Sequence, residues 1–194
     1  MHRDPSKTLP APRKTEAQRS SRQPASSARG VVRMQDTMSQ QGVVTGAIHA
    51  HGPEQDALSW FLGKWHITGY NEPLTPGGRR TTVSGLQEYE WLPGQFFLLG
   101  RFSHHFAERS HSGISVLGFE PERQAYVARN FDNLGYAREY SLEPRDRAWL
   151  FVGEGERAMY LFGEGQRSYR EHWELTQDGL VFRTLCVLEA TKLG

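Results

Sequence analysis

Turn signals recur about every ten residues from Thr75 to Gly179, and this spacing restricts the fold more than any other feature of the chain. Most of them contain Gly or Pro next to an acidic residue or Asn, as tight turns do. The segments between them are short and rich in aromatic and aliphatic residues, which is typical of β-strands. The sequence therefore predicts ten strands, at Trp65–Asn71, Thr82–Leu92, Gln95–His104, Ile114–Phe119, Gln124–Phe131, Tyr136–Leu142, Ala148–Val152, Arg157–Phe162, Ser168–Leu175 and Leu180–Glu189.

Connections of hairpin length join these strands, so neighbouring strands must run antiparallel. An open sheet of this size would leave two unpaired hydrophobic edges, whereas a closed barrel leaves none. We therefore expect an all-β fold, an antiparallel up-and-down barrel of about ten strands. Closed barrels of this size hold a small ligand or packed side chains in their interior.

The stretch Leu58–Tyr70 marks the beginning of the barrel. A short N-terminal helix over Glu54–Phe61, started by Pro53, is predicted to run into the first strand through Gly63. The aromatic side chains of this stretch are expected to plug the barrel at that end.

Charge divides the chain near residue 50. Met1–Ala50 contains 8 Lys and Arg residues against 3 Asp and Glu residues, and the remainder contains 15 against 19. The first segment also has few large apolar residues, so it cannot bury enough surface to offset the entropy of ordering it. We expect a disordered basic tail at residues 1–50 and one barrel domain at residues 51–194.

Three interpretations of the tail stay open. Its Arg-rich, acid-poor composition is found in organellar transit peptides and in basic arms that contact nucleic acid, but four prolines interrupt any amphipathic helix there. The third interpretation is a natural start at Met34 or Met38. Because no apolar run approaches the length of a membrane span and the single Cys186 cannot form an internal disulfide, we expect a cytoplasmic protein.

Two predicted strands carry aromatic and charged side chains on the same face. Their residues alternate with a period of two, as in a strand with two different faces. The mixed faces consist of Tyr136, Arg138, Tyr140 and Leu142 in one strand, and of Tyr169, Glu171, Trp173 and Leu175 in the other. A face of this kind fits a cavity with a few polar groups better than it fits a dry core.

The candidate ligand-binding residues follow from this pattern. Arg101 shares a strand face with Phe97 and Leu99, and its planar guanidinium suits a carboxylate group of a ligand. A surface arginine whose stem covers apolar area is an equal alternative. The full set of candidates is Arg101, Tyr126, Arg138, Tyr140 and His172, with Trp65 and Trp173 as apolar walls or core plugs.

No catalytic or metal-binding residues are assigned. His104 and His105 are neighbours in a strand and point to opposite faces, so both cannot enter one cavity, and a hairpin-end or surface role is favoured for them. Glu88 and Glu90 share a strand face, as a glycosidase pair could, but such pairs are ordinary on a barrel exterior.

Several short motifs follow one another in a fixed order along the chain. They are Leu58-x-x-Phe61-x-Gly63-x-Trp65, Glu88–Trp91, Pro93–Leu98, Gly118–Glu122 with Tyr126, and Phe131–Asn133 with Gly135. In this order they resemble the domain of unknown function 1579 family, and the similarity extends over about Ala57–Val187. The resemblance implies a calycin-like barrel related to lipocalins and fatty-acid-binding proteins, and it implies a fold rather than a function.

A more distant relative, the haem-binding nitrobindin-like barrel, also begins with a Gly-x-Trp strand. Its proximal histidine lies near the C-terminal strand, whereas Leu180–Lys192 of this chain contains no histidine. We therefore expect no haem and no other cofactor.

The leading hypothesis is a non-enzymatic barrel that binds a small hydrophobic or amphipathic molecule in its interior. An acidic head group of this molecule would be held by Arg101, or by Arg138 together with Tyr140. We expect no nucleic-acid or membrane partner, and a homodimer stays open.

Two other functions remain. One is a small isomerase or hydrolase with His172 as base and Glu171 or Glu88 nearby, and the other is a dry barrel that acts through its surface. A cavity of about 300 Å³ or more with an arginine inside would favour the binding protein. A filled interior would favour the dry barrel, and a histidine converging with a carboxylate at a cavity mouth would favour the enzyme.

Overall fold

The computed structural model describes residues 50–194, so the predicted tail lies outside the described residues except for Ala50. Its elements are α1 (Pro53–Leu58), the 3₁₀ turn η1 (Ser59–Phe61), β1 (Gly63–Asn71), β2 (Thr81–Trp91), β3 (Phe97–Phe106), β4 (Arg109–Glu120), β5 (Ala125–Asp132), β6 (Ala137–Arg145), β7 (Ala148–Val152), β8 (Glu156–Phe162), the 3₁₀ turn η2 (Glu164–Gln166), β9 (Ser168–Leu175) and β10 (Arg183–Lys192).

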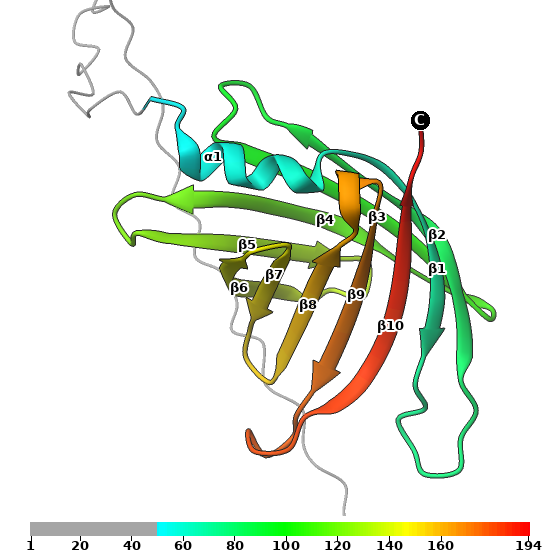
Figure 1. Cartoon of the computed structure of the whole chain (residues 1–194). Helices are drawn as coiled ribbons and strands as arrows, with labels where there is room; N and C mark the ends of the chain where they lie inside the picture. Colours follow the sequence, from blue (N-terminus) through cyan, green and yellow to red (C-terminus); the bar gives the residue numbers. More distant parts are fainter. Residues whose placement is uncertain (1–49) are drawn as a thin grey trace, which may run out of the picture. The chain divides into compact units, whose positions relative to one another are not determined.

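The ten strands form one closed antiparallel barrel (Figure 1). Each strand pairs with the next along the chain, and β1 also pairs with β10, with Trp65 opposite Lys192 and Asn71 opposite Cys186. This closure leaves no unpaired edge in the sheet. The predicted ten-stranded antiparallel barrel with a short N-terminal helix is confirmed.

β1 and β10 approach each other closely where the barrel closes. A Cβ atom added to Gly69 would lie 2.2 Å from the backbone oxygen of Val187, too close for any side chain. A glycine on β1 therefore permits the strand contact that completes the barrel.

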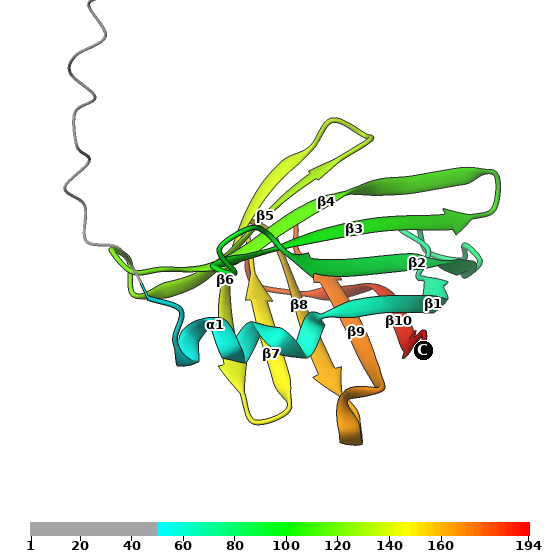
Figure 2. The same ribbon diagram turned by 90° about the horizontal axis from the view of Figure 1, so that it is seen from above.

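The helical segment lies across one end of the barrel and is formed by local signals. Pro53 occupies its first turn, and the side chain of Gln55 accepts a hydrogen bond of 2.9 Å from the backbone N–H of Gly52. The single helix predicted over Glu54–Phe61 is divided into α1 and η1, and η1 ends at Phe61, one residue before the backbone becomes extended. Figure 2 shows this segment in front of β7 and β8 in the view from above.

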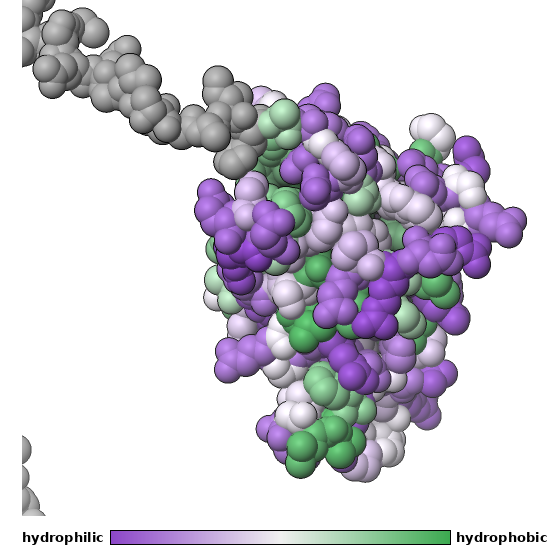
Figure 3. All heavy atoms as spheres, turned by 60° about the vertical axis from the view of Figure 1, so that its left-hand side comes forward, coloured by the Kyte–Doolittle hydropathy of each residue, from purple (hydrophilic) through white to green (hydrophobic). Residues whose placement is uncertain are grey.

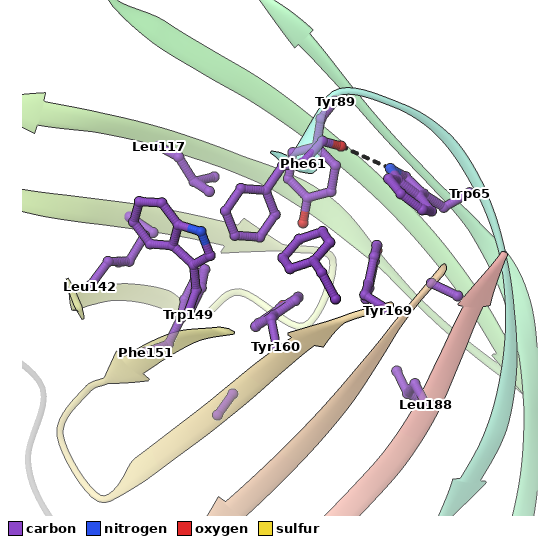
Figure 4. Close-up of a cluster of buried hydrophobic side chains, with 14 of the residues drawn as sticks. Phe61, Trp65, Tyr89, Leu117, Leu142, Trp149, Phe151, Tyr160, Tyr169 and Leu188 are labelled. Carbon is purple, nitrogen blue, oxygen red and sulfur yellow. Dashed lines mark hydrogen bonds between the residues drawn. The ribbon is translucent and has the colours of Figure 1, made fainter. Parts of the chain in front are cut away.

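A cluster of aromatic rings fills the end of the barrel beneath the helical segment (Figure 4). Phe61 is completely buried, and its ring lies 5.3–6.1 Å from five others, those of Tyr89, Trp149, Phe151, Tyr160 and Phe162. Aromatic pairs at these separations contribute stabilisation beyond the area that they bury. We call this half of the barrel the closed end.

Two strands begin three or more residues away from their predicted starts. No strand was predicted between His104 and Ile114, but the connection there is only a tight turn at Ala107 and Glu108, with a positive φ of 52° at Ala107. The polar run that suggested a loop belongs to β4, where His111 pairs with His104. The last strand begins at Arg183 rather than at Leu180, because the Asp178 side chain accepts hydrogen bonds from the backbone N–H groups of Leu180 and Val181 and holds them in a loop.

Candidate ligand-binding cavity

A cavity of about 1060 Å³ occupies the half of the barrel away from α1, which we call the open end. Residues of the β1–β2 loop, the β3–β4 turn and the β5–β6 turn form its rim, and inward-facing side chains of the strands form its walls. Known ligand cavities have volumes of about 300–1,000 Å³, so the space suits a molecule of drug size.

Exposed apolar residues lie on the loops at the open end. Leu74 and Leu134 border the cavity and are 79% and 61% exposed, and Leu180 in the β9–β10 loop is 84% exposed. Figure 3 shows hydrophobic residues gathered at the lower end of the face that it presents. The rim of the open end therefore carries exposed apolar side chains beside charged ones, and the inner wall is also partly polar.

A buried hydrogen-bond network centred on Gln87 forms the inner limit of the cavity. The Gln87 amide nitrogen donates to an oxygen of Glu171 at 2.9 Å and lies 3.2 Å from Nε2 of His104. The Gln87 amide oxygen accepts from the hydroxyl of Tyr169 at 2.5 Å. Strands β2, β3 and β9 each supply a member, so the network joins segments that are distant in the sequence.

The network fixes the protonation of His104. Because the Gln87 amide nitrogen is a donor, Nε2 of His104 must be the acceptor, and the proton of the neutral ring then lies on Nδ1. Burial, together with the nearby His111 and His105, lowers the pKa of His104 from 6.5 to about 4. His104 is therefore a neutral hydrogen-bond donor at pH 7, and its ring borders the cavity.

Glu171 is a carboxyl group inside the barrel, with 1% of its surface exposed. Burial raises its pKa, while hydrogen bonds from the Trp173 indole N–H and from Gln87 oppose that shift. The Trp173 indole N–H donates to the second Glu171 oxygen at 2.9 Å. Both carboxyl oxygens therefore have partners, and the group borders the cavity.

A second polar cluster at the cavity lies around Arg138. Its Nη1 donates to Asp132 at 2.8 Å, and its Nε lies 2.9 Å from Glu156. The Tyr140 hydroxyl donates to the same Glu156 oxygen at 2.5 Å. Burial opposes ionisation of Asp132, but hydrogen bonds from the backbone N–H of Tyr136 and from the side chains around it hold its pKa down at about 2.

Three of the seven predicted ligand-binding residues border the cavity: Arg138, Tyr140 and Trp173. All three lie on the two mixed strand faces that the sequence indicated, in β6 and β9. Although β6 and β9 are distant in the sequence, they bring two of these residues together, and the ring centres of Tyr140 and Trp173 lie 5.6 Å apart.

Arg101 and His172 lie outside the cavity. Arg101 is exposed on the outer face of β3, where it pairs with Glu90 at 2.5 Å. Phe97 and Leu99, which share this face, therefore also lie on the exterior of the barrel. His172 lies in a groove on the outer surface and is 2.9 Å from the hydroxyl of Thr184. Since Glu171 points inward from the same strand, the predicted pairing of His172 with Glu171 in one active site is wrong.

Trp65 and Tyr126 lie at the closed end rather than at the cavity. Trp65 is completely buried and donates its indole N–H to the backbone oxygen of Phe61 at 2.8 Å, as drawn in Figure 4. Tyr126 packs edge to face against Trp149 at 5.1 Å. Both side chains therefore belong to the aromatic plug.

Sequence reasoning missed Gln87 and His104 as cavity residues. The surface or hairpin-end role expected for His104 is wrong, since only 9% of its surface is exposed, although the prediction that it faces away from His105 is correct. The inward faces of β2 and β3 contain glycines between their large residues, namely Gly85 and Gly100. A strand face on which glycine alternates with large residues indicates the inner face, because glycine allows another segment to approach closely there.

Within residues 50–194, no three His, Cys, Asp or Glu side chains are placed to hold a metal ion together. In the same range no helix is long and apolar enough to cross a membrane. The Cys186 thiol borders the cavity, and burial raises its pKa to about 12.

Comparison with protein families gives a match to the family described as "Protein of unknown function (DUF1579)" over residues 50–181, more than half of the chain. The chain belongs to the DUF1579 family. This confirms the family resemblance proposed from the motifs. No curated protein matches the chain.

Among solved structures, this DUF1579 member is similar to Rv2717c from M. tuberculosis, with a TM-score of 0.56 and 12% sequence identity over 75% of this chain and 100% of that chain. The similarity shows a shared fold. Weaker similarities are to the S-type phycobiliprotein lyase CPES from Guillardia theta (TM-score 0.45, 9% identity, 72% and 92% coverage) and to a de novo designed fluorescence-activating β-barrel (TM-score 0.39, 14% identity, 71% and 98% coverage).

Proposed function

We propose that this protein binds a small amphipathic molecule in the cavity at the open end of its barrel. The observation that carries the proposal is a cavity of about 1060 Å³ that combines aromatic walls with two polar clusters. This combination is typical of ligand sites, where apolar surface supplies affinity and a few polar groups fix orientation.

The polar clusters determine how the molecule would be oriented. The Nδ1–H group of His104 has no partner among the described residues, and its ring borders the cavity, so it is free to donate to an oxygen of the ligand. The apolar part of the ligand would lie among Phe102, Phe106 and Leu188, which line the same space. This arrangement needs no catalytic step, and we propose a non-enzymatic role.

Two finer assignments accompany this proposal. We infer a calycin-like relationship of the barrel, because the order of its motifs resembles that family and a helical segment precedes the first strand. A cytoplasmic location remains a prediction from the sequence.

Titration with Nile red, an uncharged probe whose fluorescence depends on polarity, tests the proposal. We expect saturable binding of one probe per chain with a blue-shifted emission, because the cavity excludes bulk water from its apolar wall. Native mass spectrometry of the purified protein would in addition show the mass of any co-purified molecule. Nile red fluorescence that stays unchanged, or that rises without saturation, would contradict the proposal.

A further inference from the structure

We propose that the ligand of this cavity carries a positively charged ammonium group, so that the barrel selects organic cations over fatty-acid-like anions. This inference rests on the proposed ligand-binding function and adds the charge of the ligand. It differs from the acidic head group that the sequence suggested.

The charges inside the cavity have an acidic excess. Asp132 and Glu156 both border it, and their side chains are only 3% and 12% exposed. Glu171 adds a third carboxyl group, although burial raises its pKa and so favours its uncharged form. Arg138 is the cation that contacts Asp132 and Glu156 from the cavity wall. At the rim, Arg79 and Arg109 are exposed to water, where their charge is screened.

Arg138 is already occupied by protein carboxylates. One guanidinium group serves both Asp132 at 2.8 Å and Glu156 at 2.9 Å, which leaves a formal charge of −1 on the three groups together. The ring of Tyr136 covers the guanidinium at 4.2 Å. A carboxylate ligand would have to displace one of these partners, so Arg138 is a poor anchor for an anion.

The histidine of the inner network does not compensate for the carboxylates. His104 accepts a hydrogen bond from Gln87, so the geometry requires its neutral form, and burial keeps its pKa low. His111 lies at the cavity wall, and its Nε2 atom is paired with a carboxylate oxygen of Asp132 at 3.2 Å. An anion entering the cavity would therefore meet an excess of negative charge.

Aromatic rings surround the carboxylates and supply a second attraction for a cation. Tyr140, Tyr160 and Trp173 border the cavity. The ring centre of Trp173 lies 5.6 Å from that of Tyr140 and 6.2 Å from that of Tyr160. The indole of Trp173 is hydrogen-bonded to Glu171, so that ring is held in place beside a carboxyl group. Ring faces attract ammonium groups, and a neighbouring carboxylate strengthens that attraction.

Displacement of bound Nile red by decylammonium, decanol and decanoate at pH 7 tests the proposal, since the three compounds share one chain and differ in head-group charge. We expect decylammonium to bind at least about tenfold more tightly than decanoate. Glu156→Gln is expected to reduce this ratio severalfold, and Glu171→Gln is expected to reduce it less, because burial favours the uncharged form of Glu171. Circular dichroism would confirm that each variant is folded. Glu90→Gln, on the outer face beside Arg101, is the matched control and is expected to leave the ratio unchanged.

The outcomes separate the two proposals. Decanoate binding as tightly as decylammonium, or a ratio that neither inner variant alters, would overturn the inference on charge while the ligand-binding function stands. Failure of Nile red and all three decyl compounds to bind would overturn the proposed function itself.

Discussion

The closed and open ends of the barrel are built from the same strands but have opposite interiors. On β6, β8 and β9 the inward residues nearest the helical segment are Leu142, Phe162 and Tyr169, all buried in the aromatic plug. Farther along the same strands the inward positions are held by the cavity residues Arg138, Glu156 and Trp173. Stability is therefore concentrated at one end, which leaves the other end free to keep a cavity with charged groups.

The largest expected difference between the two ends concerns aromatic truncation. Phe61→Ala removes the centre of the plug and is expected to lower the free energy of unfolding by about 3–5 kcal/mol. Phe106→Ala, at the cavity wall, is expected to cost less than about 2 kcal/mol, because its ring is only half-buried and borders existing space. Urea unfolding of both variants measures these values, and equal losses would show that the two ends do not differ in packing.

The pH dependence of stability tests the inner network. His104 has a folded pKa of about 4, below the ordinary 6.5, so the unfolded chain binds more protons between these values and stability falls as pH decreases through that window. Glu171 has a raised pKa, and it contributes the opposite slope. Between pH 7 and pH 4.5, we expect the free energy of unfolding to decrease by about 2–3 kcal/mol less in His104→Gln than in the parent protein.

His66→Gln is the matched control for this measurement. His66 lies on β1, is exposed on the outer face and is not among the groups that lower the pKa of His104. Its replacement is expected to leave the pH profile of the unfolding free energy unchanged. A profile that responds equally to both substitutions would contradict the assignment of the acid sensitivity to the inner network.

A smaller effect is expected from the two arginines. Arg138→Met leaves Asp132 and Glu156 without their cation and is expected to lower the free energy of unfolding by about 1–2 kcal/mol. Arg101→Met breaks an exposed pair with Glu90 and is expected to cost less than about 0.5 kcal/mol. Thermal unfolding of the two variants at the same pH makes the comparison, and a larger loss for Arg101→Met would reverse the inside and outside assignments.

Much of the fold could be predicted from the sequence because its signals are local. The turns fix the strand number, and alternation within a strand shows which residues share a face, as with Arg138 and Tyr140 on β6 or Glu171 and Trp173 on β9. The boundary at Ala107 was missed because a polar run resembles a loop when its partner strand is unknown.

The site was less predictable because alternation does not say which face points inward. On β3 one face carries Leu99 and Arg101 and the other carries Phe102 and His104, so both faces mix apolar with polar residues. The inner network depends on barrel closure, since Gln87 and Glu171 are 84 residues apart in the chain. Contacts of this kind follow from strand pairing around the whole barrel and have no local signature.

The central claim, that the open end holds a ligand, is tested most directly by filling the cavity. Val83 lines it and is 5% exposed, whereas Val152 lies on the outer face of β7 and is 40% exposed, so the same change to Trp fills the cavity at one position and leaves it open at the other. Nile red titration of both folded variants is expected to show at least about tenfold weaker binding for Val83→Trp and unchanged binding for Val152→Trp. Equal binding by the two variants would contradict the account, because the probe would then occupy another part of the protein.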